Sequence, residues 1–186
     1  MYKSILSIII ITFLFTSCKK EQNPFEISNQ HIGLLTDSTQ VKDLKRVYAN
    51  DSIVKFIGGD EFTGNVNNIE IFEKGGKKLL TLTPKQSLDS TSTIAGIRIL
   101  DARYKTNKNI TVMSTFKDIK DNYEISGIQT SIDAVVIFLK DSDVFITIDK
   151  KQLPENLRYN PNLTIEASQI PQGATFKYFM IAWEGQ

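Results

Sequence analysis

The sequence predicts an α+β protein built mainly of antiparallel sheet, with two short amphipathic helices. From residue 25 onward, most apolar residues stand at every second position or in short runs between turn residues, which is typical of strands. Only two segments show the spacing of three and four residues that is typical of a helix. These two segments resemble each other, which indicates that one helix-and-strand unit is used twice.

The composition is that of one ordinary globular domain. The chain has 186 residues, of which 41% are hydrophobic and 23% charged. Outside residues 1–17, which contain Lys3 and no acidic residue, basic and acidic side chains are equal in number. A dedicated nucleic-acid binder concentrates Lys and Arg in a strongly basic domain, so this balance argues against a nucleic-acid partner. We expect residues 25–186 to form a single domain.

The segment 1–17 has the pattern of a signal peptide. Lys3 gives a positive start, Ile5 to Phe15 is an apolar run, and the small residues Thr16 and Ser17 follow. Eleven helical residues rise only about 16 Å, roughly half of the hydrocarbon core of a bilayer. An export signal therefore fits better than a membrane span.

The end of this segment resembles the lipobox of bacterial lipoproteins. Phe15-Thr16-Ser17-Cys18 closes the apolar run, and Cys18 is the chain's one cysteine, although Phe15 stands where that motif usually has Leu. The resemblance implies that Cys18 is diacylated, for example with palmitate, and becomes the new N-terminus. Residues 18–24 would then be a lipidated tether, and two acyl chains suffice for stable anchoring in a membrane. The alternative is an ordinary secretory signal with a chance cysteine.

Ten segments are predicted as strands, most of them partners in hairpins. Glu73 to Lys78 contains two glycines that suit a tight turn, and Lys140 to Asp143 has residues that bond their own backbone in turns. Alternation along the last strand places apolar side chains on both of its faces, so we expect it to be central or covered. The ten ranges are Ser52 to Ile57, Asn68 to Phe72, Lys78 to Leu82, Thr93 to Leu100, Ile110 to Met113, Ile128 to Ser131, Ala134 to Leu139, Val144 to Ile148, Leu163 to Ala167 and Phe176 to Ala182.

The two predicted helices have similar starts. The first covers Val41 to Tyr48, and Ser38 or Thr39 is expected to cap it. The second covers Phe116 to Tyr123, and Thr115 with Asp118 has the spacing of a capping box.

The two helical segments superimpose when the chain is shifted so that Lys42 falls on Lys117. The shift places Lys42 to Tyr48 on Lys117 to Tyr123, and each copy is followed by a predicted strand. We interpret this as an internal duplication covering about residues 32–57 and 108–131. A chance likeness between two amphipathic helices with similar caps is the alternative.

The repeated phrases IGLLTDSTQVKDLKRVY and NITVMSTFKDIKDNY resemble the helix-start motif of small envelope lipoproteins. One such family is the stress-regulated lipoprotein family of enteric bacteria, whose function is not established. The tandem-repeat modules of the β-lactamase inhibitor protein and the small lipoprotein subunit of the β-barrel assembly machine are others. The lysine-rich start after Cys18 resembles outer-membrane lipoproteins of Bacteroidota-type envelopes. These resemblances imply a binding or assembly role at the outer membrane, on its periplasmic or its surface side, and transfer no catalytic residue.

Other motifs favour no catalytic site. Gly58 to Phe62 spells GGDEF, a string found in diguanylate cyclases, but the metal-binding segment that precedes it in those enzymes is absent, so we expect a turn. His31 is the only histidine, and Cys18 is assigned to the anchor. We therefore expect no metal site, no cofactor and no His-dependent catalysis. Carboxylate pairs for hydrolysis are neither supported nor opposed by counting acidic residues.

The leading functional hypothesis is a non-catalytic envelope lipoprotein, held by Cys18 in the membrane, that binds a protein or another envelope component. A carboxylate-dependent hydrolase acting on polysaccharide or peptidoglycan is one alternative. An inhibitor or immunity lipoprotein with an exposed anchor residue on a protruding loop is another.

Overall fold

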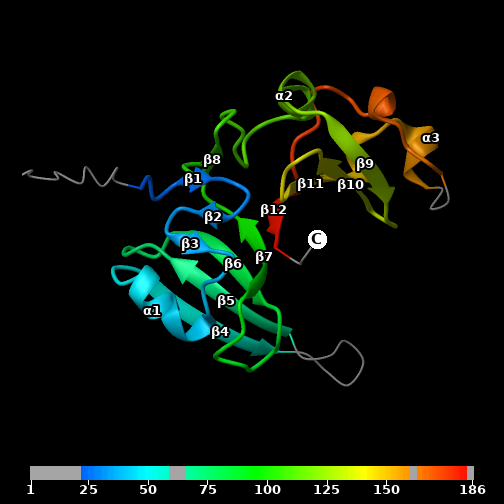
Figure 1. Ribbon diagram of the computed structural model, residues 1–186. Helices are drawn as coiled ribbons and strands as arrows, with labels where there is room; N and C mark the ends of the chain where they lie inside the picture. Colours follow the sequence, from blue (N-terminus) through cyan, green and yellow to red (C-terminus); the bar gives the residue numbers. More distant parts are fainter. Residues whose placement is uncertain (1–21, 59–65, 160–162, 184–186) are drawn as a thin grey trace, which may run out of the picture.

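The computed structural model describes residues 22–58, 66–159 and 163–183, and it confirms the α+β class with mainly antiparallel sheet. Its main layer is an eight-stranded antiparallel sheet in the order β4-β5-β6-β7-β12-β11-β10-β9 (Figure 1). The predicted hairpin turns are present, and the last strand is central, between β7 and β11. The strands are β4 (Ser52–Gly58), β5 (Val66–Phe72), β6 (Lys78–Pro84), β7 (Ile94–Ile99), β9 (Ile125–Thr130), β10 (Ala134–Leu139), β11 (Val144–Asp149) and β12 (Tyr178–Ala182).

A small four-stranded sheet covers the middle of one face of the large sheet. Its order is β3-β2-β1-β8, and its β1 and β8 are parallel. Each strand has two residues, which is too short for an alternating pattern to reveal. The strands are β1 (Glu26–Ile27), β2 (His31–Ile32), β3 (Leu35–Thr36) and β8 (Lys105–Thr106).

The helical segments are short. Among the described residues, the first predicted helix consists of the 3-10 turn η1 (Val41–Asp43) followed by α1 (Leu44–Val47), and the second is α2 (Phe116–Asn122). The connection between β11 and β12 contains three further turns that the sequence analysis did not predict. They are η2 (Lys150–Gln152), α3 (Glu155–Arg158) and η3 (Ala167–Gln169).

The large sheet consists of two four-stranded meanders of the same design. One is β4 to β7, preceded by α1, and the other is β9 to β12, preceded by α2. The last strands of the two halves, β7 and β12, pair with each other and close the sheet. Ile99 of β7 lies opposite Phe179 of β12, and each of them also lies opposite an isoleucine or leucine in the third strand of its own half.

The helix starts are bound in the same way in both halves. In each, the two residues that begin the helical segment donate backbone hydrogen bonds to the loop before the last strand, and the residue before them forms a β-bridge with that loop. The donors of the two halves are related by the same shift that places Lys42 on Lys117. The hydrogen bonds are Val41 to Ser92, Lys42 to Ser90, Phe116 to Ala174 and Lys117 to Gln172, and the bridges are Gln40–Thr93 and Thr115–Thr175.

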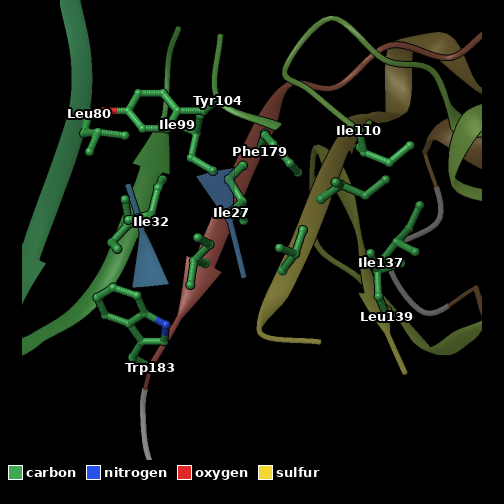
Figure 2. Packing of buried hydrophobic residues seen from close by; sticks show 14 of the residues in the cluster. Ile27, Ile32, Leu80, Ile99, Tyr104, Ile110, Ile137, Leu139, Phe179 and Trp183 are labelled. Carbon is green, nitrogen blue, oxygen red and sulfur yellow. The ribbon is translucent and has the colours of Figure 1, made fainter. Parts of the chain in front are cut away.

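The hydrophobic core lies between the large sheet on one side and the small sheet and helices on the other. Figure 2 shows Ile27 and Ile32 of the small sheet in this cluster, together with Ile99 and Phe179 of the large sheet. The side chains of Phe116 and Ile119 bring α2 onto the same core. Alternate strand residues point to opposite faces of a sheet. One face of the large sheet is therefore buried in the core, and the other face lies outside it.

Two predicted strands are absent from the described part of the chain. Ile110 to Met113 is a turn: Ile110 is buried, but its carbonyl accepts from the Thr106 backbone, and Met113 is 75% exposed. Leu163 to Ala167 runs without ladder partners into η3, with Ile165 buried. In both segments the apolar residues anchor a loop on the core, a pattern that sequence alone does not separate from a strand.

The predicted cap of the first helix is also wrong. The residue before η1 is Gln40, and it makes no side-chain capping bond. The hydroxyl of Thr39 instead accepts from the Thr36 backbone N–H at 3.0 Å and so belongs to the preceding turn. The cap predicted for the second helix is confirmed, because Thr115 and Asp118 form the reciprocal capping box.

Candidate functional site

A polar cleft of about 730 Å³ lies where the small sheet meets the second half of the large sheet. It is bounded by the β1–β2 loop, the loop after β8, the end of α2 and the β10–β11 turn. The lining includes Glu26, Ser28, Asn29, His31, Asn107, Lys108, Tyr123, Glu124, Lys140 and Asp141.

The loops of the cleft are tied together across long stretches of chain. The Asn29 side chain donates to the Asp141 carbonyl at 2.9 Å, and the Trp183 indole N–H donates to the Asn29 carbonyl at 2.8 Å. The β1–β2 loop is thereby fixed both to the distant β10–β11 turn and to the last described residue. This fixes the width of the cleft at that end.

The charged groups of the cleft are mostly engaged with one another. Lys140 pairs with Glu124 at 2.8 Å. Lys108 donates to the Asn122 carbonyl at 2.5 Å, and its ammonium lies 4.1 Å from the centre of the Tyr123 ring. Such a cleft can hold a polar ligand but presents no group that stands out as reactive.

The one histidine lies in this cleft. His31 Nδ1 is 2.5 Å from the Ser28 hydroxyl, across the turn between β1 and β2. The Ser28 backbone N–H also donates to the His31 carbonyl, so the pair belongs to the hydrogen bonding of the hairpin. No observation favours a role in catalysis.

The carboxylates of the cleft are exposed to solvent. Glu26, Glu124 and Asp141 are all exposed. A glycosidase's general acid sits in an apolar setting that keeps it protonated. The carboxylates of this cleft therefore do not favour the hydrolase alternative.

A second charged cluster ties the first half to the start of the chain. The fully buried Asp101 carboxylate accepts two hydrogen bonds from the Arg103 side chain, at 2.8 and 3.1 Å, and pairs with Lys77 at 2.9 Å. Arg103 also pairs with Glu73 at 2.7 Å and stacks 4.4 Å from the Phe25 ring. Hydrogen bonds from Arg103, and then from Lys77, hold the pKa of Asp101 well below its usual range. This cluster stabilises the β5–β6 turn and the loop after β7.

The face of the large sheet opposite the core carries a row of aromatic and flexible side chains that spans the second half and the neighbouring strand β7. We call Phe138, Phe145, Met180 and Arg98, together with Tyr178, the aromatic row. The first four lie in register across four neighbouring strands, from β10 through β11 and β12 to β7. Phe138 stacks on Phe145 with ring centres 5.9 Å apart, and Arg98 lies 4.2 Å from the centre of the Tyr178 ring. All five side chains are partly exposed.

The same face of the first half mixes polar side chains with the apolar Val54 and Phe72. Beyond Arg98 the register continues through Thr81 of β6 and Glu70 of β5 to Val54 of β4. Glu70 forms an ion pair with Lys78. The stacked aromatic pair of this surface therefore lies in the second half.

Several residues that the sequence analysis singled out lie outside the described part of the chain. Cys18, the predicted lipidation site, lies outside the described residues, as do Gly59 to Phe62 of the GGDEF string, while Gly58 ends β4. In the described part of the chain, no helix is long and apolar enough to span a bilayer, and no group of three potential metal ligands is found.

Sequence reasoning missed both the cleft and the aromatic row. The cleft depends on short loops that meet only in the fold. The row had a detectable signal, because Phe138, Phe145 and Met180 alternate with the buried residues of three predicted strands.

Comparisons with known proteins show a likeness of fold. No family model matches the chain, and no curated protein sequence matches it. Among solved structures, the chain is similar to the uncharacterised protein YfeY from Escherichia coli, with a TM-score of 0.57 and 16% sequence identity. The match covers 84% of this chain and 99% of YfeY. At this identity the likeness concerns the fold alone, and its occurrence in an enteric bacterium agrees with the resemblance noted from the sequence.

Proposed function

We propose that this protein is a non-catalytic lipoprotein of the cell envelope, anchored in the outer membrane through Cys18, that binds another protein through the aromatic row. The signal-like N-terminus and the lipobox-like FTSC support the envelope placement. The partly exposed aromatic row supports the binding role and is the observation on which it rests.

The composition of the row is that of a protein interface. Aromatic residues, Met and Arg are enriched in the centres of interfaces, where a few of them carry most of the binding energy. Here three aromatic rings, one Met and one Arg are contiguous on one sheet face. Rings already stacked on each other lose little conformational freedom when a partner binds.

Cross-strand stabilisation alone is a weaker explanation of the row. Aromatic pairs on a sheet contribute roughly 0.2–1 kcal/mol each. The corresponding pair in the first half is Phe72 of β5 opposite Lys78 of β6, and the same four-stranded meander forms there with a single ring in place of the stacked pair. The fold therefore has no general need of an aromatic row there.

We further infer that the two halves arose by internal duplication. The shift that superimposes the helical segments in the sequence also relates the backbone donors at the two helix starts. The Ile71–Leu80 pair of β5 and β6 and the Ile137–Ile146 pair of β10 and β11 correspond as well, each half joining the second and third strands of its meander in the same way. This supports the expected likeness to the tandem-repeat modules of envelope and inhibitor proteins.

The test is site-specific photo-crosslinking in the native host. A photoreactive amino acid replaces Met180 in one strain and Thr83, an exposed residue on the polar part of the same face, in the control strain. We expect one reproducible protein adduct from position 180 and none from position 83. With that partner purified, Phe145→Ala should weaken binding about tenfold or more. No adduct at 180, or equal adducts at both positions, would overturn the binding surface.

The anchor is tested separately. Radiolabelled palmitate should enter the wild-type chain, and Cys18→Ser should abolish the labelling and release the protein from membranes. Membrane binding that persists unchanged in Cys18→Ser would remove the anchor from the proposal.

One observation favours the inhibitor version of this function. Ile132, at the tip of the β9–β10 hairpin, is 85% exposed. An apolar side chain on a protruding hairpin is what an inhibitor would insert into an enzyme's pocket. If the crosslinked partner is a lytic enzyme, Ile132→Asp should relieve the inhibition of that enzyme. If the enzyme stays equally inhibited by the variant, the aromatic row alone is its contact surface.

A further inference from the structure

A second hollow lies beside the polar cleft, at the first described residues. It encloses about 610 Å³ and is lined by Gln22, Asn23, Glu26, Lys105, Thr106, Asn107 and Asn109. Its lining residues are all of polar types, with one cation and one carboxylate among amide and hydroxyl groups. The hollow and the polar cleft share Glu26, Thr106 and Asn107.

The wall formed by the loop after β8 is built around one buried hydroxyl. Thr106 Oγ1 accepts from the backbone N–H groups of Lys108 and Ile110, at 3.3 and 3.2 Å. The Thr106 backbone also donates to the Ile110 carbonyl and accepts from Asn109. Asn107 and Asn109 are therefore presented on a turn that is held in shape before any ligand arrives, which lowers the cost of binding.

The opposite wall is fixed as well. Gln22 donates to the Gly33 carbonyl at 2.5 Å, and the Gly33 backbone donates to Glu26. Gly33 has a φ of 56°, and a Cβ there would stand 2.1 Å from the Pro24 carbonyl oxygen, so only glycine admits this close approach. Phe25 packs edge-on against Tyr104, with ring centres 5.1 Å apart. The chain is thus bound to the domain from Gln22 onward.

The two charged side chains of the hollow, Glu26 and Lys105, lie next to each other without an ion-pair partner in the described part of the chain. Glu26 of β1 and Lys105 of β8 are register partners on parallel strands, so their side chains leave the same side of the small sheet. Both are exposed, and within the described part of the chain neither makes an ion pair. One positive and one negative group therefore stand side by side, each free to bind an opposite charge.

Chain length places this hollow near a membrane. This step rests on the proposed acylation of Cys18. Four residue steps separate Cys18 from Gln22, and a fully extended chain spans at most about 3.6 Å per residue, or about 14 Å in all. Since the chain is bound to the domain at Gln22, the hollow must lie within a short distance of the lipid headgroups.

We propose that the hollow binds the zwitterionic headgroup of an ethanolamine phospholipid and so orients the domain on the bilayer. Lys105, with the amide N–H groups of Asn107 and Asn109, binds the phosphate. Glu26 accepts hydrogen bonds from the ammonium, which a trimethylated headgroup could not donate. The small sheet then faces the membrane, and the aromatic row, on the far face of the large sheet, faces away from it.

Orientation is tested with the acylated protein in vesicles that carry a quencher on the lipid headgroup. Because Cys18 is acylated and no other cysteine exists, one fluorophore can be attached through Ala102→Cys in the loop after β7, or through Thr83→Cys on the far face as the control. We expect strong quenching at position 102 and none at 83. Equal quenching at both positions, or stronger quenching at 83, would overturn the proposal.

Headgroup chemistry is tested with soluble probes and the mature chain. Glycerophosphoethanolamine should shift the NMR signals of the Asn107 and Asn109 side-chain amides, and Lys105→Glu should abolish the shift while Lys85→Glu, at an exposed lysine elsewhere, leaves it unchanged. No shift would overturn the proposal. An equal shift with glycerophosphate would show a phosphate site without ethanolamine recognition, which also contradicts it.

The two proposals fail separately. An intact mass without acyl chains at Cys18 removes the anchor and with it the membrane orientation. A fully acylated protein whose position 102 is not quenched removes only the orientation and leaves the anchor and the aromatic row in place.

Discussion

The two halves of the large sheet have the same backbone design and differ in what they do with it. In the first half, the face opposite the core mixes polar residues with Val54 and Phe72, and the charged cluster around the buried Asp101 ties its turns together. In the second half, the same face carries the aromatic row, and a long connection with α3 extends the chain before β12. Ion pairs thus stabilise the turns of the first half, whereas the second half leaves an apolar surface partly exposed.

This difference separates the positions that make the fold from those that can carry function. Residues facing the core are aliphatic or aromatic in both halves, as at Ile99 and Phe179, because burial there supports the sheet. Residues on the other face are free to diverge, and Glu70 of β5 stands where the second half has Val136 of β10. The same strands therefore serve as scaffold on one side and as a variable surface on the other.

The largest expected effect comes from the helix anchors. Phe116→Ala should lower the free energy of unfolding by about 3–5 kcal/mol, because this ring is fully buried under α2. Its counterpart in the first half, Val41, is smaller, so Val41→Ala should cost clearly less. Urea unfolding of both variants measures the difference. Equal losses would mean that the two helices are not equivalent supports of the core.

The next effect concerns Asp101. Asp101→Asn removes the charge that Arg103 and Lys77 share, and we expect a loss of about 2 kcal/mol at neutral pH, since both partners can turn toward water. The exposed Asp133, which pairs with Lys177 in the second half, is the control, and Asp133→Asn should cost much less than Asp101→Asn, because water screens an exposed ion pair. Chemical unfolding at pH 7 measures both losses, and equal values would contradict the role of burial at Asp101.

The same carboxylate predicts how stability depends on pH. Because Arg103 lowers the pKa of Asp101 in the folded protein, the unfolded chain takes up a proton first as the pH falls. The stabilisation is complete above the unfolded pKa of about 3.9 and declines below it, toward the folded pKa. Asp101→Asn should flatten this acid limb of the stability curve. If the stability of the wild type and of the variant fell equally at acid pH, the dependence could not be assigned to Asp101.

The sequence predicted most of the large sheet, because hairpin signals mark its turns. Ala134 to Leu139 was predicted to the residue, since two turn segments bound an apolar run. The small sheet was missed because two-residue strands have no period, and Ile110 to Met113 was misassigned because an anchored loop has the apolar pattern of a strand. The cleft was beyond prediction, since Asn29 and Asp141 meet only through tertiary structure.

The helix caps give a smaller effect that sharpens the comparison of the two halves. Asp118 accepts from the Thr115 backbone N–H at 2.7 Å, so Asp118→Ala should cost about 1 kcal/mol. Gln40→Ala, at the corresponding start of the first helix, removes no side-chain capping bond and should stay within about 0.5 kcal/mol. The contrast is read from thermal unfolding. A larger loss for Gln40→Ala would show that the bridge to Thr93 supports the first helix through the Gln40 side chain.

The smallest effect on stability is expected where the effect on binding is largest. Val136 of β10 lies next to the aromatic row, and the structurally corresponding residue of the first half is Glu70, so Val136→Glu gives the second half the polarity of the first. On a partly exposed sheet face this change should cost less than about 1 kcal/mol, while the adduct at Met180 should disappear. Glu70→Gln is the matched control in the first half and should leave the adduct intact. A cost of several kcal/mol for Val136→Glu would instead mean that this face is as closed as the core, and the distinction between a scaffold side and a binding side would then fall.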